Sequence, residues 1–169
     1  MTNTGMTHDK TTLRPITDAD WDGIMAIQAQ CYGALGPESL EVMQSKWHSS
    51  PGSCFVMELQ GELLGYCLAH PWQQDAPPPL YQTLPPLERR GKLYLHDMAF
   101  SAHARGKGLG KQALAKLTQQ ARAWQLDALA LVAVLGADSY WQRQGFSAIP
   151  CPKPLDSYGP DALYMNRPL

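Results

Sequence analysis

The sequence predicts an α/β fold in which one twisted, mixed, mostly antiparallel sheet of six to seven strands carries helices on both faces. Three observations lead to this prediction. Residues 92–135 read as strand, helix and strand, and such a unit demands a parallel strand pair with a right-handed crossover. A hairpin pattern at 54–70 and a closing strand pair at 146–166 demand antiparallel pairing. A mixed sheet covered on both sides meets all three requirements.

The N-terminal part of the chain predicts a tail, a strand and two helices. Residues 1–10 are polar and are expected to be a disordered tail, so the predicted single domain spans residues 11–169. Residues 11–16 favour a short strand. Thr17 begins an N-cap signal, and apolar residues then recur at helical spacing to about Tyr32. Pro37 suits the first turn of a second helix that continues to about Trp47.

The next segment predicts a hairpin followed by a long loop. Residues 54–59 and 63–70 are strand-like runs on either side of a turn at 60–62. Residues 71–91 contain six prolines and no apolar period. A structureless stretch of about twenty residues suggests a flap that covers a site, with a passive insertion as the alternative.

The second half of the chain supplies the strand–helix–strand unit and the closing strands. Residues 92–100 predict a strand, and apolar residues from Leu109 to Trp124 mark one face of a helix. Residues 126–135 are nearly all apolar, which suits a strand buried on both faces. A short helix over 136–144 is ended by Gly145, and residues 146–149 and 162–166 can pair as the last strands.

Composition excludes several classes of function. The 169 residues carry a net charge of −1, so no overall field draws the protein to nucleic acid or to an anionic membrane. No segment has the roughly 18 apolar residues of a membrane span, and no apolar signal segment begins the chain. We therefore expect a cytoplasmic protein. The sequence contains four cysteines: Cys31, Cys54, Cys67 and Cys151. Their spacings match no metal-ligand pattern, so no metal is expected.

A basic, glycine-rich segment links the strand at 92–100 to the following helix: Arg105-Gly106-Lys107-Gly108-Leu109-Gly110-Lys111. Glycines let the backbone approach a ligand and direct successive N–H groups at it. A helix N-terminus adds partial positive charge, and the three basic side chains add full charges. The segment therefore predicts a cradle for a phosphate or pyrophosphate group.

The glycine spacing argues against two nucleotide-binding classes. A P-loop requires G-x-x-x-x-G-K-[ST], whereas Lys111 is followed by Gln112. The dinucleotide fingerprint G-x-G-x-x-G requires a third glycine one residue later than Gly110. A dinucleotide-binding oxidoreductase is therefore disfavoured.

Arg105, Gly108 and Gly110 match the pattern [Q/R]-x-x-G-x-[G/A], and Tyr140-Trp141-Gln142-Arg143-Gln144-Gly145-Phe146 follows at the expected distance. With these strings in this element order, the sequence resembles the GNAT superfamily of N-acetyltransferases over roughly residues 11–167. The resemblance implies the acyl-CoA N-acyltransferase fold with acetyl-CoA as co-substrate. It also implies a bulged strand that pairs with the pantetheine arm, and the cofactor-binding residues implied are Met98, Ala99, Phe100, Arg105, Gly106, Lys107, Gly108, Leu109, Gly110, Lys111 and Trp141.

His96 is the candidate general base, since an imidazole suits proton removal near neutral pH. It lies two residues before Met98, so strand alternation predicts that both side chains share one face. Residues 95–99, and the flap, resemble the arylalkylamine (serotonin) N-acetyltransferase branch, where a His-Leu-His on this strand serves as the base pair. The first of those positions is Tyr94 here, so only His96 carries over.

The sequence leaves open whether a general acid protonates the departing thiolate. The family's tyrosine aligns with Trp141, whose indole N–H cannot protonate a thiolate. Tyr140 is the adjacent candidate catalytic residue if the helix register is altered. Alternatively no acid is used, because a thiol of pKa about 8.5 leaves fairly well unprotonated.

Together these features predict an acetyltransferase acting by direct attack in a ternary complex on the primary amine of a small molecule, with an aryl-alkylamine as one option. The alternative is a non-catalytic acyl-CoA-binding or regulatory module, which Trp141 favours. No nucleic-acid or membrane partner is expected, and the chain is expected to be a monomer or homodimer. The acceptor is expected to enter between the first two helices and the flap, and its candidate walls are Trp21, Tyr32, Trp47, Trp72 and Tyr81.

Overall fold

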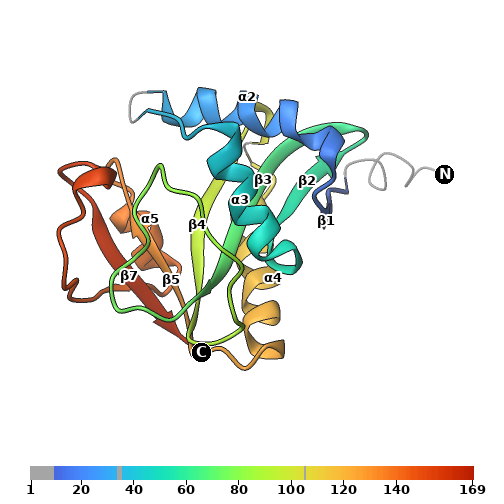
Figure 1. The fold of residues 1–169 in the computed structure, drawn as a ribbon. Helices are drawn as coiled ribbons and strands as arrows, with labels where there is room; N and C mark the ends of the chain where they lie inside the picture. The colour runs from blue at the N-terminus through green and yellow to red at the C-terminus, as the bar shows by residue number, and fades with distance from the viewer. Residues whose placement is uncertain (1–9, 34–35, 105) are drawn as a thin grey trace.

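The computed structural model describes residues 10–33, 36–104 and 106–169, and it contains a seven-stranded mixed sheet in the order β1-β2-β3-β4-β5-β7-β6 (Figure 1). Only the β4–β5 pair is parallel among the described strands. This confirms the predicted fold class. The strands are β1 (Thr12–Pro15), β2 (Phe55–Leu59), β3 (Glu62–Trp72), β4 (Lys92–Phe100), β5 (Ala128–Ala133), β6 (Ser147–Ala148) and β7 (Leu163–Pro168).

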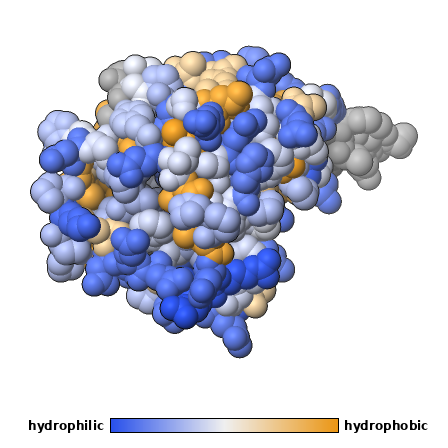
Figure 2. Space-filling view, viewed as in Figure 1, coloured by the Kyte–Doolittle hydropathy of each residue, from blue (hydrophilic) through white to orange (hydrophobic). Residues whose placement is uncertain are grey.

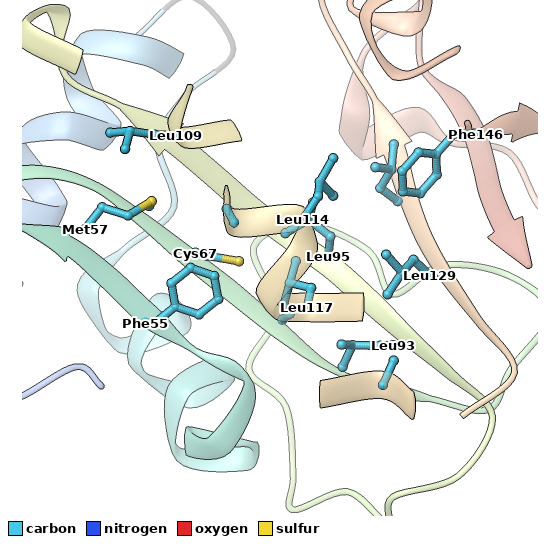
Figure 3. Close-up of a cluster of buried hydrophobic side chains, with 14 of the residues drawn as sticks. Phe55, Met57, Cys67, Leu93, Leu95, Leu109, Leu114, Leu117, Leu129 and Phe146 are labelled. Atoms are coloured by element: carbon cyan, nitrogen blue, oxygen red, sulfur yellow. The ribbon is translucent and has the colours of Figure 1, made fainter. Parts of the chain in front are cut away.

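Helices cover both faces of the sheet, as predicted. Helices α2 (Trp21–Tyr32) and α3 (Leu40–Ser49) pack on one face, with Val56 and Tyr66 of the sheet beneath them. Helix α4 (Leu109–Ala123) packs on the other face with the short helix α5 (Asp138–Arg143) nearby. Figure 3 shows this second layer, where Leu114 and Leu117 of α4 lie over sheet residues such as Leu95. Strand alternation therefore sorts the core into two layers, one under each set of helices.

The element boundaries agree with the sequence patterns wherever the periodicity was strong. Strand β4 and the start of α4 lie where they were predicted. Helix α3 differs, because Ser39 is its N-cap, with the Ser39 hydroxyl accepting from the N–H of Val42, and the helix begins after Pro37 rather than at it. The expected disordered tail at 1–10 lies almost wholly outside the described residues.

Strands β4 and β5 pair over a short length and then separate. Their register runs only from Leu93 opposite Leu129 to Leu95 opposite Leu131. Strand β4 continues to Phe100 without that neighbour, while β3 stays paired with it on the other side. The separation leaves one edge of β4 open in the middle of the sheet, directly before the glycine-rich segment.

The surface that carries α2 and α3 mixes hydrophobic and hydrophilic residues, as Figure 2 shows. Such mixing is typical of a protein surface in contact with water. Across residues 10–33, 36–104 and 106–169, none of the helices combines the length and apolar character needed to cross a membrane.

Candidate active site

A cavity of about 810 Å³ opens where β4 and β5 separate. One part of its wall comes from β4, the glycine-rich segment, β5 and α5. The other part comes from α2, the segment before α3, the flap and the loop between β6 and β7, with Tyr32, Glu38, Leu80 and Tyr158 as its lining residues. The cavity thus joins the predicted cofactor segment to the region under the flap.

The glycine-rich segment presents open backbone to this cavity. Gly106 and Gly108 have φ angles of +76° and +66°, and a Cβ built on either would meet nothing within 4 Å. Both residues line the cavity, and Gly108 is the N-cap of the 15-residue helix α4. The helix N-terminus and the bare backbone therefore face the same space, which suits a phosphate group. Lys107 and Lys111 are exposed on this segment, and Arg105 lies outside the described residues.

Gly110 is held against α5. A Cβ built on Gly110 would collide with the hydroxyl of Tyr140, so only glycine allows this approach. Tyr140 and Trp141 both line the cavity. Burial raises the pKa of the Tyr140 phenol. Trp141 stacks edge-on against Phe146, with 5.5 Å between ring centroids, and packs on the core layer under α4.

A β-bulge in β4 decides which way the site residues point. Leu68 of β3 is opposite Asp97 and Ala69 is opposite Leu95, so His96 is the extra residue in β4. The bulge turns the consecutive side chains of His96 and Asp97 to the face of α2 and α3, where they contact Glu38 and Tyr66 respectively.

The bulge corrects one prediction. Met98 packs on the opposite layer, under α4, and Ala99 on the layer under α2. His96 and Met98 therefore lie on opposite faces, because the inserted residue reverses the alternation that predicted a shared face.

His96 is paired with a carboxylate in the interior. Its Nε2 atom lies 2.6 Å from Oε1 of Glu38, and the two side chains are 0% and 5% exposed. Burial raises the pKa of Glu38, but the hydrogen bond and charge of His96 outweigh it together with the N–H of Tyr81 and the charge of Lys46, so the pKa lies below its ordinary value. The Nδ1 atom of His96 is buried without a hydrogen-bond partner among the described residues. His96 also lines the cavity.

Asp97 is a second buried acid at the bulge. Its Oδ2 atom accepts a 2.7 Å hydrogen bond from the hydroxyl of Tyr66, and the residue lines the cavity. Burial raises its pKa to about 6, against the opposing effects of the His96 charge and the Tyr66 hydrogen bond. A carboxyl group that titrates near pH 6 can exchange a proton under ordinary conditions.

The open part of β4 carries the other predicted cofactor residues. Met98 and Phe100 line the cavity, whereas Ala99 is buried under α2 and is not among the lining residues. The Met98 carbonyl accepts a hydrogen bond from the Tyr32 hydroxyl at 3.2 Å, and the Phe100 carbonyl accepts one from the Cys31 thiol at 3.3 Å. Side chains of α2 therefore already engage the backbone that was predicted to meet a pantetheine arm.

The predicted loop at 71–91 begins two residues late, because Pro71 and Trp72 still pair with β4 as the end of β3. The flap is therefore residues 73–91, and it lies against α3 and the loop before β7 (Figure 1). Buried Lys46 donates from Nζ to the carbonyl of Gln82, Ser45 accepts from the N–H of Leu84, and Ser157 accepts from the N–H of Leu80. Leu80 lines the cavity, so the flap forms part of its wall. The flap is thus anchored to α3 and to the loop before β7, and it contributes Leu80 to the cavity wall.

The five aromatic residues predicted to line the acceptor pocket lie in three different places. Tyr32 lines the main cavity. Trp21 and Trp47 pack together in the core under α2, with 5.7 Å between ring centroids. Trp72 lines a smaller cavity of about 440 Å³ between the flap and residues 151–158, and Tyr81 directs its hydroxyl to the carbonyl of Gly36.

Three polar residues near the bulge gave no signal in the sequence. Glu38 lies in a segment without periodicity, Asp97 was part of a strand pattern, and His70 sits in an apolar strand. His70 is fully buried 6.3 Å from His96 between ring centroids, and burial lowers its pKa to about 3. Each lies at the site only through strand pairing or a contact that is distant in the chain.

Comparisons with known proteins agree with this architecture. At 16% identity, Ard1 from Thermoplasma volcanium superposes with a TM-score of 0.72 over 94% of this chain and 97% of that chain. The loading GNATL domain of CurA from Lyngbya majuscula gives 0.74 at 14% identity, over 95% and 98%. The ribosomal-protein-S18-alanine N-acetyltransferase from Escherichia coli gives 0.65 at 16% identity, over 94% of each chain.

A search of curated proteins found no match. The likeness to solved structures establishes the fold, and the family is established by a family model, described as the acetyltransferase (GNAT) family, that matches residues 21–146. The match runs from the start of α2 to Phe146 and so includes the glycine-rich segment and the β4 bulge. The chain therefore belongs to the GNAT family and is an acetyl-CoA-dependent N-acetyltransferase.

Proposed function

We propose that the enzyme transfers the acetyl group of acetyl-CoA to the primary amine of a small molecule by direct attack in a ternary complex, with aryl-alkylamines as the first class to test. The observation that carries this proposal is the buried His96–Glu38 pair in the wall of the cavity, to which the flap contributes Leu80. A cavity walled in part by the flap suits a small acceptor, because a folded protein substrate requires an open approach. The aromatic side chains of Tyr32 and Tyr158 in the same wall favour an apolar body on the acceptor.

In this proposal, acetyl-CoA binds at the open backbone of the glycine-rich segment. Gly106, Gly108 and Gly110 would hold the pyrophosphate together with the α4 N-terminus. Met98 and Phe100 would contact the pantetheine arm, and Trp141 would pack beside it. Arg105, Lys107 and Lys111 would add positive charge. Acetyl-CoA supplies the activated acetyl group and leaves as the thiol.

His96 is the proposed general base. An attacking amine must give up one proton as its nitrogen bonds to the acetyl carbon, and a neutral imidazole can accept that proton. The unpartnered Nδ1 atom of His96 supports the assignment, because it leaves one ring nitrogen able to accept. Holding the amine beside the base within one cavity supplies the proximity that direct transfer requires.

Tyr140 is the proposed acid for the thiolate that leaves. Its burial keeps the phenol protonated at neutral pH, and it lines the cavity beside the glycine-rich segment. Departure without an acid remains the alternative, and it predicts that Tyr140→Phe leaves the turnover number unchanged.

A thiol-release assay against a panel of amines tests the proposal. We expect release from acetyl-CoA with small primary amines at rates well above hydrolysis, and a decrease of about 10² to 10⁴ in kcat for His96→Gln. Calorimetric titration with acetyl-CoA should give equal affinities for the unmodified enzyme and for His96→Gln. Binding without amine-dependent release would instead favour the non-catalytic module, the function that Trp141 suggests.

A further inference from the structure

Glu38 holds two distant parts of the chain with one carboxylate. Its Oε1 atom lies 2.6 Å from Nε2 of His96, 58 positions away in the β4 bulge. Its Oε2 atom accepts a 2.8 Å hydrogen bond from the backbone N–H of Tyr81, 43 positions away in the flap. The residue is 5% exposed, so both hydrogen bonds are shielded from water.

The backbone of Glu38 is also fixed. The side chain of Gln28, which is 2% exposed, donates from Nε2 to the Glu38 carbonyl at 3.1 Å and accepts from the Glu38 N–H at 3.0 Å. This two-point clamp ties the segment before α3 to α2. The carboxylate therefore reaches the bulge from a rigid position, which a surface ion pair would lack.

The pairing determines which nitrogen of His96 can accept a proton. A carboxylate accepts hydrogen bonds only, so in the neutral ring the proton must sit on Nε2, facing Glu38. The Nδ1 atom then carries the lone pair. When Nδ1 takes a proton, the charge on the ring is balanced by Glu38, in the way that a carboxylate supports the histidine of a catalytic triad.

We propose that Glu38 is the positioning residue for the base: it fixes the Nε2–H tautomer of His96 and, through the N–H of Tyr81, joins the orientation of the ring to the closed flap. The proposal rests on the proposed role of His96. Neighbouring flap contacts favour it, since Lys46 donates to the carbonyl of Gln82 one residue after Tyr81. An acceptor that displaces the flap would thus loosen the support of the base until the flap closes again.

Nitrogen-15 NMR of histidine-labelled protein tests the tautomer without any activity measurement. At a pH high enough for the ring to be neutral, we expect His96 of the unmodified enzyme to have a protonated Nε2 and an unprotonated Nδ1. Its signal is identified by its loss in His96→Gln. In Glu38→Gln the amide can act as donor or acceptor, so the signal should move toward a mixture of tautomers. An unchanged spectrum in Glu38→Gln overturns the proposal, whether or not any amine is acetylated.

Kinetics supply the second readout. Glu38→Gln should lower kcat by about 10- to 100-fold, as loss of a supporting partner does, while the KM for acetyl-CoA stays within about twofold. The matched control is Glu62→Gln, because His103 and Glu62 form an equally short pair at 2.6 Å that is exposed to solvent. That control should leave kcat and the His96 signal unchanged. A wild-type kcat in Glu38→Gln contradicts the positioning role.

Hydrogen exchange tests the connection to the flap. Glu38→Ala removes the acceptor of the Tyr81 N–H and should accelerate exchange in residues 80–84 by at least about tenfold. Glu38→Gln keeps an oxygen acceptor and should retain most of the protection. Equal exchange in Glu38→Ala and the unmodified protein would show that the flap closes independently of Glu38 and would overturn that part of the proposal.

Discussion

The hydroxyl of Tyr66 on β3 donates a 2.7 Å hydrogen bond to Oδ2 of Asp97 on β4, directly beneath α2. This bond gives Asp97 a partner, but it does not compensate fully for the loss of hydration, so the pKa of the carboxyl rises to about 6. Asp97 is therefore a destabilising charge at neutral pH, placed beside His96 in the wall of the cavity. Functional sites often carry strain of this kind.

Asp97→Asn should stabilise the protein at neutral and alkaline pH. Because the folded state holds the Asp97 proton more tightly than the unfolded chain, this group makes stability fall as pH rises from about 4 to about 6, with no further change above. The raised pKa corresponds to at most about 3 kcal/mol. In urea unfolding, Asp97→Asn should therefore increase the free energy of unfolding by up to that amount at pH 8 and leave it unchanged near pH 3.5. Asp161→Asn, in an exposed loop, is the control. Parallel pH curves for Asp97→Asn and the unmodified protein would contradict this prediction.

His70 should contribute acid sensitivity of the opposite sign. Burial lowers its pKa to about 3, so the unfolded chain takes up a proton at a higher pH than the folded state. Its contribution to stability is complete above about pH 6.5 and is lost as pH falls toward 3. His70→Gln should consequently flatten the acid limb of the stability curve by a few kcal/mol. The exposed His48→Gln should not. An acid limb that is as steep in His70→Gln as in the unmodified protein refutes the assignment.

Gly110→Ala should disturb the glycine-rich segment by collision with Tyr140. Its added Cβ would collide with the Tyr140 hydroxyl, while the next ring atom lies 3.7 Å away, an ordinary contact. Overpacking of this kind costs about 1–3 kcal/mol. We expect lower thermal stability and at least tenfold weaker acetyl-CoA binding by calorimetry. Tyr140→Phe removes the colliding oxygen and should restore both properties in the double variant. Failure of the double variant to recover would mean that Gly110 is needed for another reason.

Lys46→Met should loosen the flap with little change in global stability. The side chain of Lys46 is fully buried, and burial lowers its pKa although Glu38 opposes that effect. Removing the ammonium ends its desolvation cost, which offsets the loss of its hydrogen bond to Gln82. A non-specific protease should then cleave residues 80–85 several times faster in Lys46→Met than in the unmodified protein. Lys116→Met, on the exposed side of α4, serves as the comparison. Equal cleavage rates in Lys46→Met and Lys116→Met would show that Lys46 does not anchor the flap.

Periodic segments were predicted well, because local spacing alone determines which side chains they bury. Strand β4 and the first residue of α4 follow from alternation and from the glycines between them. The faces of His96 and Met98 were predicted wrongly, because a bulge is an extra residue relative to β3 and leaves no mark in β4 itself. Glu38 could not be found from the sequence, since its role arises from a contact across 58 positions.

The brief pairing of β4 with β5 has a consequence for the lifetime of the protein. Among the described residues, the ladder between β4 and β5 runs only from Leu93 to Leu95, with one further backbone hydrogen bond beside it from the N–H of Asp127 to the carbonyl of Gly91. A co-substrate lying along Met98 and Phe100 would bridge that seam in the folded state and have no equivalent in the unfolded chain. At a concentration one hundred times its dissociation constant, such a ligand adds about 2.7 kcal/mol to the free energy of unfolding. Proteolytic turnover of the enzyme is thus expected to slow when acetyl-CoA is plentiful and to quicken when it is scarce.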